Sequence, residues 1–286
     1  GVTGRGEAVP YARYGETVEG AMDTVERLRP AIESGATRGE LQDLVMAGAA
    51  RNALDCALWD LEAKLTGQPA WKTAGLARLD PVKTCVTLSL DTPEAMAEVA
   101  RGLQRRPMLK LKIGAAGDLD RVEAVRAAAP KTRLVVDANE ALSFEDLKRL
   151  APEFARLDVK LVEQPLPAGA DEALEGWVSP VPLCADESVR TRLELETCAR
   201  RYACVNIKLD KAGGLTEALA MKARAAELGL EVMAGCMVGT SLAMAPGVIL
   251  AQGAAYVDLD RPLLLVKDRT PGLRIDGSLI HPPGAE

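Results

Sequence analysis

Short runs of apolar residues recur along most of this chain, and polar segments with helical character separate them. From residue 82 onward, the apolar runs have the length of β-strands and lie at residues 84–90, 108–113, 133–137, 159–163, 181–185, 204–209, 231–235 and 255–259. The intervening segments carry helix signals, such as Ser143 at the start of one segment and Gly229 at the end of another. Eight strands that alternate with helices predict an α/β fold, and we expect a parallel (β/α)7β-type TIM-like barrel. A doubly wound sheet is disfavoured because no glycine-rich dinucleotide loop follows the first strand.

The first 80 residues have a different pattern, which predicts a small α+β capping domain. Residues 6–10 have the form of the end of a short strand. A helix is expected from its N-cap at Thr17 to residue 33, and a second helical region at 41–65, with Gly67 after its end. We therefore expect a capping domain at 1–80, the barrel at 81–266, and a C-terminal segment at 267–286 that returns to the capping domain.

Composition narrows the class of protein. The net charge of −6 argues against a nucleic acid or an anionic membrane as partner, and no apolar run is long enough to span a bilayer. The six cysteines form no CxxC pair, so we expect buried free thiols in a reducing compartment and a cytoplasmic protein. The sequence does not define the oligomeric state, and a homo-oligomer is compatible with it.

Polar residues stand at the ends of successive predicted strands. They are Lys112, Asp137, Glu163, Asp186 and Lys208, spaced at intervals of 22 to 26 residues. Side chains at the carboxyl ends of barrel strands converge on one face, where such barrels have their active sites. Three converging carboxylates repel one another without a cation, and oxygen ligands favour a hard ion such as Mg²⁺. The pattern predicts a Mg²⁺ site with lysines on the strands at either side.

The single histidine, His281, lies in a proline-rich tail, so a serine–histidine triad is disfavoured. Proton transfer would then depend on lysine, aspartate, glutamate, tyrosine or cysteine. An alternative from another chemical class is an aldolase that forms a Schiff base at Lys208, although such an enzyme needs no metal site. A non-catalytic binding barrel is a third alternative.

The motifs resemble those of the enolase superfamily, in its muconate-lactonizing subgroup. They are Lys-x-Lys (110–112), Asp-x-Asn (137–139), Glu-Gln-Pro (163–165), Ala-Asp-Glu-Ser (185–188) and Asn-Ile-Lys-Leu-Asp-Lys-x-Gly-Gly (206–214). Gly-Cys-Met (235–237), Asp-Leu-Asp (258–260) and two motifs of the first lobe (6–16 and 50–61) make the chain most similar to the L-Ala-D/L-Glu (dipeptide) epimerases.

The resemblance implies a role for each candidate residue. The Mg²⁺ ligands would be Asp137, Glu163 and Asp186, and the two acid/base groups would be Lys112 and Lys208, on opposite faces of the substrate α-carbon. The supporting residues would be Lys110, which lowers the pKa of Lys112 by repulsion, and Asn139 and Asp210, which orient ligand and base. The substrate-binding residues would be Arg13, Tyr14, Asp258 and Asp260. The implied reaction is Mg²⁺-dependent epimerisation of a small-molecule dipeptide by two-base 1,1-proton transfer through an enediolate.

The sequence departs from the family pattern at two places. Members usually have a further strand and a capping loop before the motif at residues 4–7, and this first strand of the cap is missing from the sequence. Arg261 follows Asp-Leu-Asp at a position where glycine is common, which predicts a cation at the rim of the site.

Other reactions of the superfamily use the same metal and lysines. They include N-acylamino acid racemisation, o-succinylbenzoate synthesis and muconate cycloisomerisation. Because Asp258 and Asp260 are two further anions near the reacting end of the substrate, we expect them to bind the free α-ammonium of a dipeptide. On this hypothesis, acetylating L-Ala-L-Glu lowers kcat/KM at least about tenfold.

Overall fold

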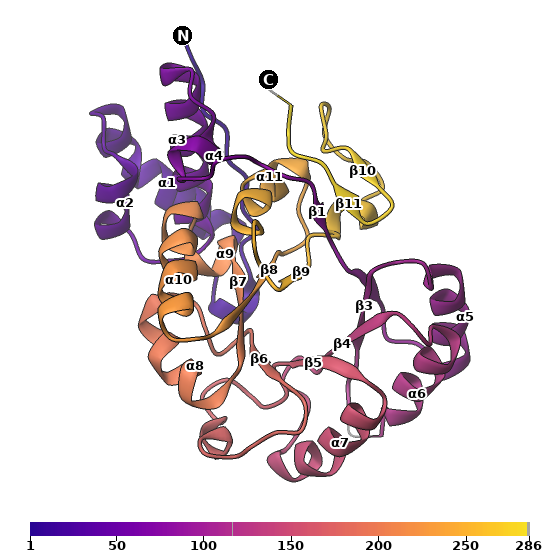
Figure 1. The fold of residues 1–286 in the computed structure, drawn as a ribbon. Helices are drawn as coiled ribbons and strands as arrows, with labels where there is room; N and C mark the ends of the chain where they lie inside the picture. The colour runs from indigo at the N-terminus through magenta and orange to yellow at the C-terminus, as the bar shows by residue number, and fades with distance from the viewer. Residues whose placement is uncertain (116, 285–286) are drawn as a thin grey trace.

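A curled parallel sheet forms the centre of the computed structural model, which describes residues 1–115 and 117–284 (Figure 1). Among these residues, eight strands pair in chain order: β2 (Val86–Leu88), β3 (Met108–Lys112), β4 (Arg133–Asp137), β5 (Val159–Glu163), β6 (Leu183–Ala185), β7 (Cys204–Lys208), β8 (Glu231–Gly235) and β9 (Tyr256–Val257). The first and last strands of this sheet meet where the Cys85 N–H donates to the Val257 carbonyl at 2.9 Å, which closes the barrel. The predicted parallel barrel is confirmed.

The barrel interior is layered. Every strand, or the residue beside it, contributes one side chain to an inner cluster: Cys85, Met108, Val135, Leu161, Cys184, Cys204, Met233 and Tyr256. Because side chains alternate along a strand, the residues two positions later point the same way. They are Thr87, Lys110, Asp137, Glu163, Asp186, Asn206, Gly235 and Asp258. An apolar layer is therefore followed, toward the carboxyl ends of the strands, by a polar one.

Helices lie outside the strands in Figure 1. They are α5 (Pro93–Leu103), α6 (Leu119–Ala128), α7 (Phe144–Arg156), α8 (Leu195–Arg201), α10 (Leu215–Glu227) and α11 (Ser241–Leu250), with α9 (Leu209–Ala212), η2 (Glu172–Leu174), η3 (Arg192–Glu194) and η4 (Arg261–Leu264) in connections. Ser143 caps α7 as predicted, since its side chain accepts from the Asp146 N–H. Asp118 stands at the N-cap of α6, but its carboxylate accepts from the Gly114 N–H instead.

The first lobe is helical, with η1 (Ala12–Tyr14), α1 (Val18–Glu33), α2 (Arg38–Leu44), α3 (Ala49–Thr66) and α4 (Ala70–Thr73). The predicted helix from Thr17 to residue 33 is confirmed. The predicted helix at 41–65 was wrong in part, because it is broken between α2 and α3. At the break, the Glu16 carboxylate accepts from the Ala49 N–H, which starts α3. The predicted strand at 6–10 was also wrong: no strand precedes Val82 within the described residues.

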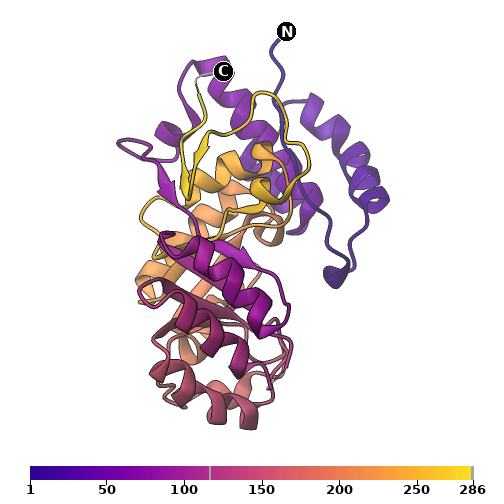
Figure 2. The same ribbon diagram turned by 90° about the vertical axis from the view of Figure 1, so that its right-hand side faces the viewer.

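The C-terminal segment lies beside the start of the barrel. Its strands β10 (Ile275–Asp276) and β11 (Leu279–Ile280) form an antiparallel sheet with β1 (Val82–Lys83), in the order β1-β11-β10. Both termini consequently lie at the same end of the molecule (Figures 1 and 2).

The cysteines and the helices can be compared with the expectations for free thiols and for membrane spans. The six cysteines are buried free thiols in the described part of the chain, as expected. No helix of residues 1–115 and 117–284 is both long enough and apolar enough to cross a membrane.

Candidate active site

The order of the strands places the two candidate acid/base lysines across the barrel from each other. Lys112 ends β3 and Lys208 ends β7, and four steps of the eight-strand order among the described residues separate them. Lys112 and Lys208 each lie four positions after a residue of the inner apolar cluster, so the two lysines stand at the same height along the barrel axis. The carboxylates of Asp137, Glu163 and Asp186 come from β4, β5 and the end of β6, which lie between them. The predicted arrangement of lysines on either side of three acids is present.

Lys110 is surrounded by carboxylates. Its Nζ lies 2.7 Å from Glu163 Oε2, 2.8 Å from Asp258 Oδ2 and 3.1 Å from Asp137 Oδ2. Burial by itself lowers the pKa of Lys110, but attraction to Asp137, Asp258 and Glu163 outweighs it and raises the pKa well above the ordinary value. Lys112 Nζ lies 3.6 Å from the same Asp137 oxygen, so Lys110 presents a fixed positive charge close to Lys112.

Asp186 accepts contacts from two lysines. Lys208 Nζ lies 2.6 Å from its Oδ2, and Lys211 Nζ lies 2.6 Å from its Oδ1. Lys211 also donates to the Asn206 carbonyl at 3.0 Å and is 1% exposed. Burial lowers the pKa of Lys208, but the charges of Asp186 and Glu163 raise it overall. The sequence analysis gave Lys211 no role, although it stands in the quoted motif at 206–214.

Glu163 is the most enclosed of the three acids. Asn206 Nδ2 donates to its Oε1 at 2.8 Å, and its Oε2 forms the 2.7 Å ion pair with Lys110 Nζ. Gly235 beside Asn206 is required, because a Cβ there would lie 2.2 Å from Asn206 Oδ1. Burial and the charge of Asp137 raise the pKa of Glu163 to about 7.

These acids fit a hard divalent cation. Three buried carboxylates on neighbouring strands supply only oxygen atoms, as Mg²⁺ prefers, and their negative charges require cations nearby, which Lys110 and Lys208 provide in this structure. A backbone hydrogen bond orients the Asp137 carboxylate, since its Oδ1 accepts from the Asn139 N–H at 3.1 Å. The Asn139 side chain accepts from Lys112 Nζ at 2.5 Å, so Asn139 contacts both a candidate ligand and a candidate base, as expected.

The Asp258 and Asp260 carboxylates are both buried at the end of β9, but they are not equivalent. Asp258 is paired with Lys110 through Oδ2 and accepts from the Cys85 thiol through Oδ1, and its binding of a substrate ammonium stays a prediction. Asp260 Oδ2 accepts from the Thr87 N–H at 2.7 Å, and Oδ1 has no hydrogen-bond partner in the described chain. Cys85, Asp258 and Asp260 place possible ligand atoms within 4.8 Å of one another. The Lys110 contact already balances one of these charges, which disfavours a second metal there.

Arg13 and Tyr14 reach the mouth of the barrel from η1. Arg13 forms an ion pair with Glu140, in the loop after β4, and 38% of its side chain is exposed. The Tyr14 ring lies 4.5 Å from the Arg190 guanidinium. Burial and the charge of Asp186 raise the pKa of Tyr14, which indicates how close the ring lies to the acids.

Asp210, which was expected to help orient ligand and base, lies outside this group of residues, in α9. The chain turns into α9 after Lys208, so strand alternation ends there. Asp210 Oδ1 instead accepts from the Val9 N–H at 2.8 Å and Asn52 Nδ2 at 2.9 Å. It joins the first lobe to the loop that carries Lys208.

The α3 helix also joins the first lobe to the segment that follows β7. Arg51 donates to the Ala212 carbonyl at 2.6 Å, and Asp55 accepts from the Thr216 N–H at 3.0 Å. Gly214, with φ of 119°, allows this approach, because a Cβ there would lie 2.4 Å from Asp55. The 50–61 motif was quoted only for its resemblance, and its contacts show that it holds the β7–α10 connection in place.

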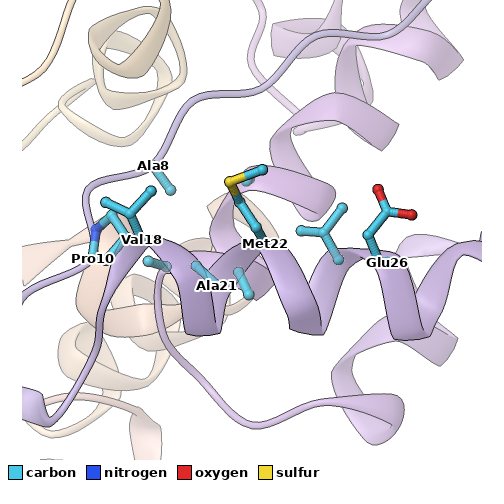
Figure 3. A pocket seen from close by; sticks show the side chains of 10 residues that line it. Ala8, Pro10, Val18, Ala21, Met22 and Glu26 are labelled. Carbon is cyan, nitrogen blue, oxygen red and sulfur yellow. The ribbon is translucent and has the colours of Figure 1, made fainter.

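A pocket of about 290 Å³ lies elsewhere, between the N-terminal segment, α1 and α3 (Figure 3). Figure 3 shows Ala8, Pro10, Val18 and Met22 around it, with Glu26 at one end. Its apolar lining offers no set of acid/base groups, so we assign the chemistry to the barrel mouth.

Family models match both parts of the chain. The model described as mandelate racemase / muconate lactonizing enzyme, N-terminal domain, matches residues 1–75, and the model described as enolase C-terminal domain-like matches residues 94–283. The chain belongs to the mandelate racemase/muconate lactonizing enzyme family of the enolase superfamily. Members of this superfamily use Mg²⁺, in agreement with the carboxylate layer.

Individual family members are similar over nearly the whole chain. An N-acetyl-D-glutamate racemase of Pseudoalteromonas sp. is 46% identical, over 93% of this chain and 85% of the relative. The L-Ala-D/L-Glu epimerase of Escherichia coli (strain K12) is 43% identical, over 98% of this chain and 88% of the relative.

A solved structure of a family member is also similar over nearly the whole chain. A crystal structure of an enolase family member from Agrobacterium tumefaciens, with homology to dipeptide epimerases and with bound sodium and L-Ala-L-Glu, has a TM-score of 0.97 and 50% identity. The match covers 99% of this chain and 86% of that one. The curated relatives are epimerases and racemases, which places this family member among the isomerases.

Proposed function

We propose that this protein catalyses Mg²⁺-dependent epimerisation of dipeptides of the L-Ala-D/L-Glu type. The observation that supports this most is the placement of Lys112 and Lys208 on opposite sides of three carboxylates at one barrel mouth. Epimerisation requires removal of a proton from one face of a carbon and its return to the other face, and two opposed amines suit that task.

Asp137, Glu163 and Asp186 are the residues that would hold the metal. When bound, Mg²⁺ supplies positive charge that stabilises the negative charge developing on the substrate carboxylate as the α-proton leaves. Lys110 adds a buried ammonium on the same side, held by three acids.

Lys112 and Lys208 would exchange protons with the substrate α-carbon. An amine near the ordinary lysine pKa of about 10.4 is a poor base at neutral pH, so the local charges decide its role. Lys110 places a buried ammonium close to Lys112, because both contact the same oxygen of Asp137. Lys208 is held as an ammonium by Asp186 and Glu163, which equips it to donate a proton. When Lys208 acts as the base for the opposite epimer, Asp186 must have another cation to bind.

Asp260 is the residue we propose for the amino end of the substrate. Its Oδ1 is buried and free of hydrogen bonds among the described residues, so it can accept from a substrate N–H. Arg13 and Tyr14 would contact the substrate from the first lobe, at the rim of the same site. A Schiff-base mechanism at Lys208 is disfavoured, since it needs no metal and would leave the three buried carboxylates without a role.

The test is to incubate a small library of L,L-dipeptides with the protein and Mg²⁺ in D₂O and to follow deuterium incorporation by mass. We expect deuterium at the C-terminal α-carbon of L-Ala-L-Glu, with formation of L-Ala-D-Glu. If no dipeptide gains deuterium while an N-acylamino acid does, the racemase alternative replaces this proposal.

A further inference from the structure

Arg261, the first residue of η4, lies beside the carboxylate proposed for the amino end of the substrate. Its Nε is 3.7 Å from Asp260 Oδ1, which is close enough for charge attraction but too far for a normal hydrogen bond. The Arg261 side chain is 16% exposed, so this cation is held mostly out of solvent. The Asp260 Oδ1 charge is therefore compensated, but the atom still has no hydrogen-bond donor among the described residues.

The Asp-Leu-Asp segment thus has a cation for each carboxylate. Lys110 faces Asp258 at 2.8 Å, and Arg261 faces Asp260. Burial lowers the pKa of Arg261, but attraction to Asp258 and Asp260 outweighs it, which agrees with a guanidinium held by both acids. An uncompensated acid pair would strongly favour an ammonium over a neutral amide, and a compensated pair favours it less.

We propose that Arg261 determines specificity at the amino end of the substrate, by allowing the Asp260 site to accept a neutral acylated nitrogen as well as a free ammonium. This inference rests on the proposed function. An ammonium and an amide N–H can both donate to Asp260 Oδ1, and Arg261 removes much of the electrostatic difference between them. The tenfold penalty for acetylation that the sequence predicts is accordingly reduced in the native chain.

The experiment compares kcat/KM for L-Ala-L-Glu and its acetylated form, N-acetyl-L-Ala-L-Glu, in the native protein, Arg261→Gly, Arg261→Gln and Arg261→Lys. We expect the ratio of the two values to stay below about tenfold in the native protein and in Arg261→Lys. In Arg261→Gly and Arg261→Gln it should rise at least about tenfold in favour of the dipeptide, equivalent to about 1.4 kcal/mol. Arg261→Gln keeps most of the side-chain volume, so it covers the case in which Arg261→Gly fails to fold.

Two controls separate charge from structure. Arg78→Gly removes an arginine whose side chain is 82% exposed and paired with Asp80, and it should leave the ratio unchanged. In an Asp260→Asn background, removing Arg261 should no longer change the ratio, because the two residues act through one interaction.

The outcomes are distinguishable. If both compounds are turned over and the ratio is the same with and without Arg261, the specificity role is overturned and the proposed function stands. If the native protein exchanges the α-proton of neither compound, the proposed function is overturned, and this inference with it.

Discussion

Lys110 shows how one residue links stability and chemistry in this site. It is 2% exposed and has Asp137, Glu163 and Asp258 within 3.1 Å, so its ammonium balances much of the negative charge that the polar layer buries. Breaking a buried charge pair from one side is strongly destabilising, because the partner is left uncompensated.

We therefore predict that Lys110→Met lowers the free energy of unfolding by about 3–5 kcal/mol in metal-free buffer. Mg²⁺ should restore part of the loss, since it offers the same acids another cation. Urea unfolding with and without Mg²⁺ measures both effects. The matched control, Lys148→Met, breaks an exposed pair with Glu145 and should cost less than about 1 kcal/mol. Equal losses in the two variants would contradict this account.

Glu163 predicts how metal affinity depends on pH. Its pKa is raised to about 7, so in the metal-free protein it is mostly protonated at pH 6 and mostly ionised at pH 8. A metal requires the ionised form, and binding then releases a proton. The affinity for Mg²⁺ should fall about tenfold from pH 8 to pH 6. Calorimetry in two buffers of different ionisation enthalpy measures affinity and proton release together. An affinity that is independent of pH over this range would contradict the raised pKa of Glu163 in the metal-free protein.

At the scale of elements, the first lobe and the barrel meet at α3 and α9, and Asp210 lies between them. Burial raises the pKa of Asp210 from 3.8 to about 6. The folded protein thus holds a proton more tightly than the unfolded chain does. The stabilisation from this group is complete below pH 4 and is lost as the pH rises through 6.

Asp210→Asn removes this titration but keeps an oxygen for the Val9 N–H and Asn52 Nδ2. Relative to the native protein, the variant should gain up to about 3 kcal/mol of unfolding free energy between pH 4 and pH 7. Denaturant unfolding across this range checks it, with Asp23→Asn as an exposed control. A difference that stays constant with pH would show that Asp210 is ionised at the joint throughout.

The contact between the first lobe and the barrel also shows which features could not be predicted from the sequence. Caps and apolar runs are local signals, so Thr17, Ser143 and the barrel strands could be placed from the sequence. The break between α2 and α3 depends on Glu16, more than thirty residues from Ala49, and no local pattern encodes that contact. The contacts of Asp210 with Val9 and Asn52 could not be predicted either, because the chain leaves the strand conformation after Lys208.

For the molecule as a whole, the parallel barrel brings residues from the ends of successive strands together at one end of the barrel. Alternation from one apolar layer brings Lys112, Asp137, Glu163, Asp186 and Lys208 to one mouth, so those residues could be found from strand ends alone. Contacts across the barrel could not, because Lys110 and Asp258 are 148 residues apart and meet only when the sheet closes. That contact gives Asp258 a second role, in balancing the charge of Lys110, beside the substrate binding predicted for it.

The central claim is that Lys112 and Lys208 act on opposite faces of the substrate α-carbon beside a Mg²⁺ ion. The most direct measurement follows α-deuteration and epimerisation of L-Ala-L-Glu and L-Ala-D-Glu in D₂O, for the native protein, Lys112→Ala and Lys208→Ala. We predict that the native protein exchanges and interconverts both epimers until the metal is chelated. Each variant should lose interconversion, and any exchange that remains should be confined to one epimer, opposite in the two variants. If either variant interconverts the epimers at the native rate, or if full turnover survives exhaustive chelation, the two-base, metal-dependent account is wrong.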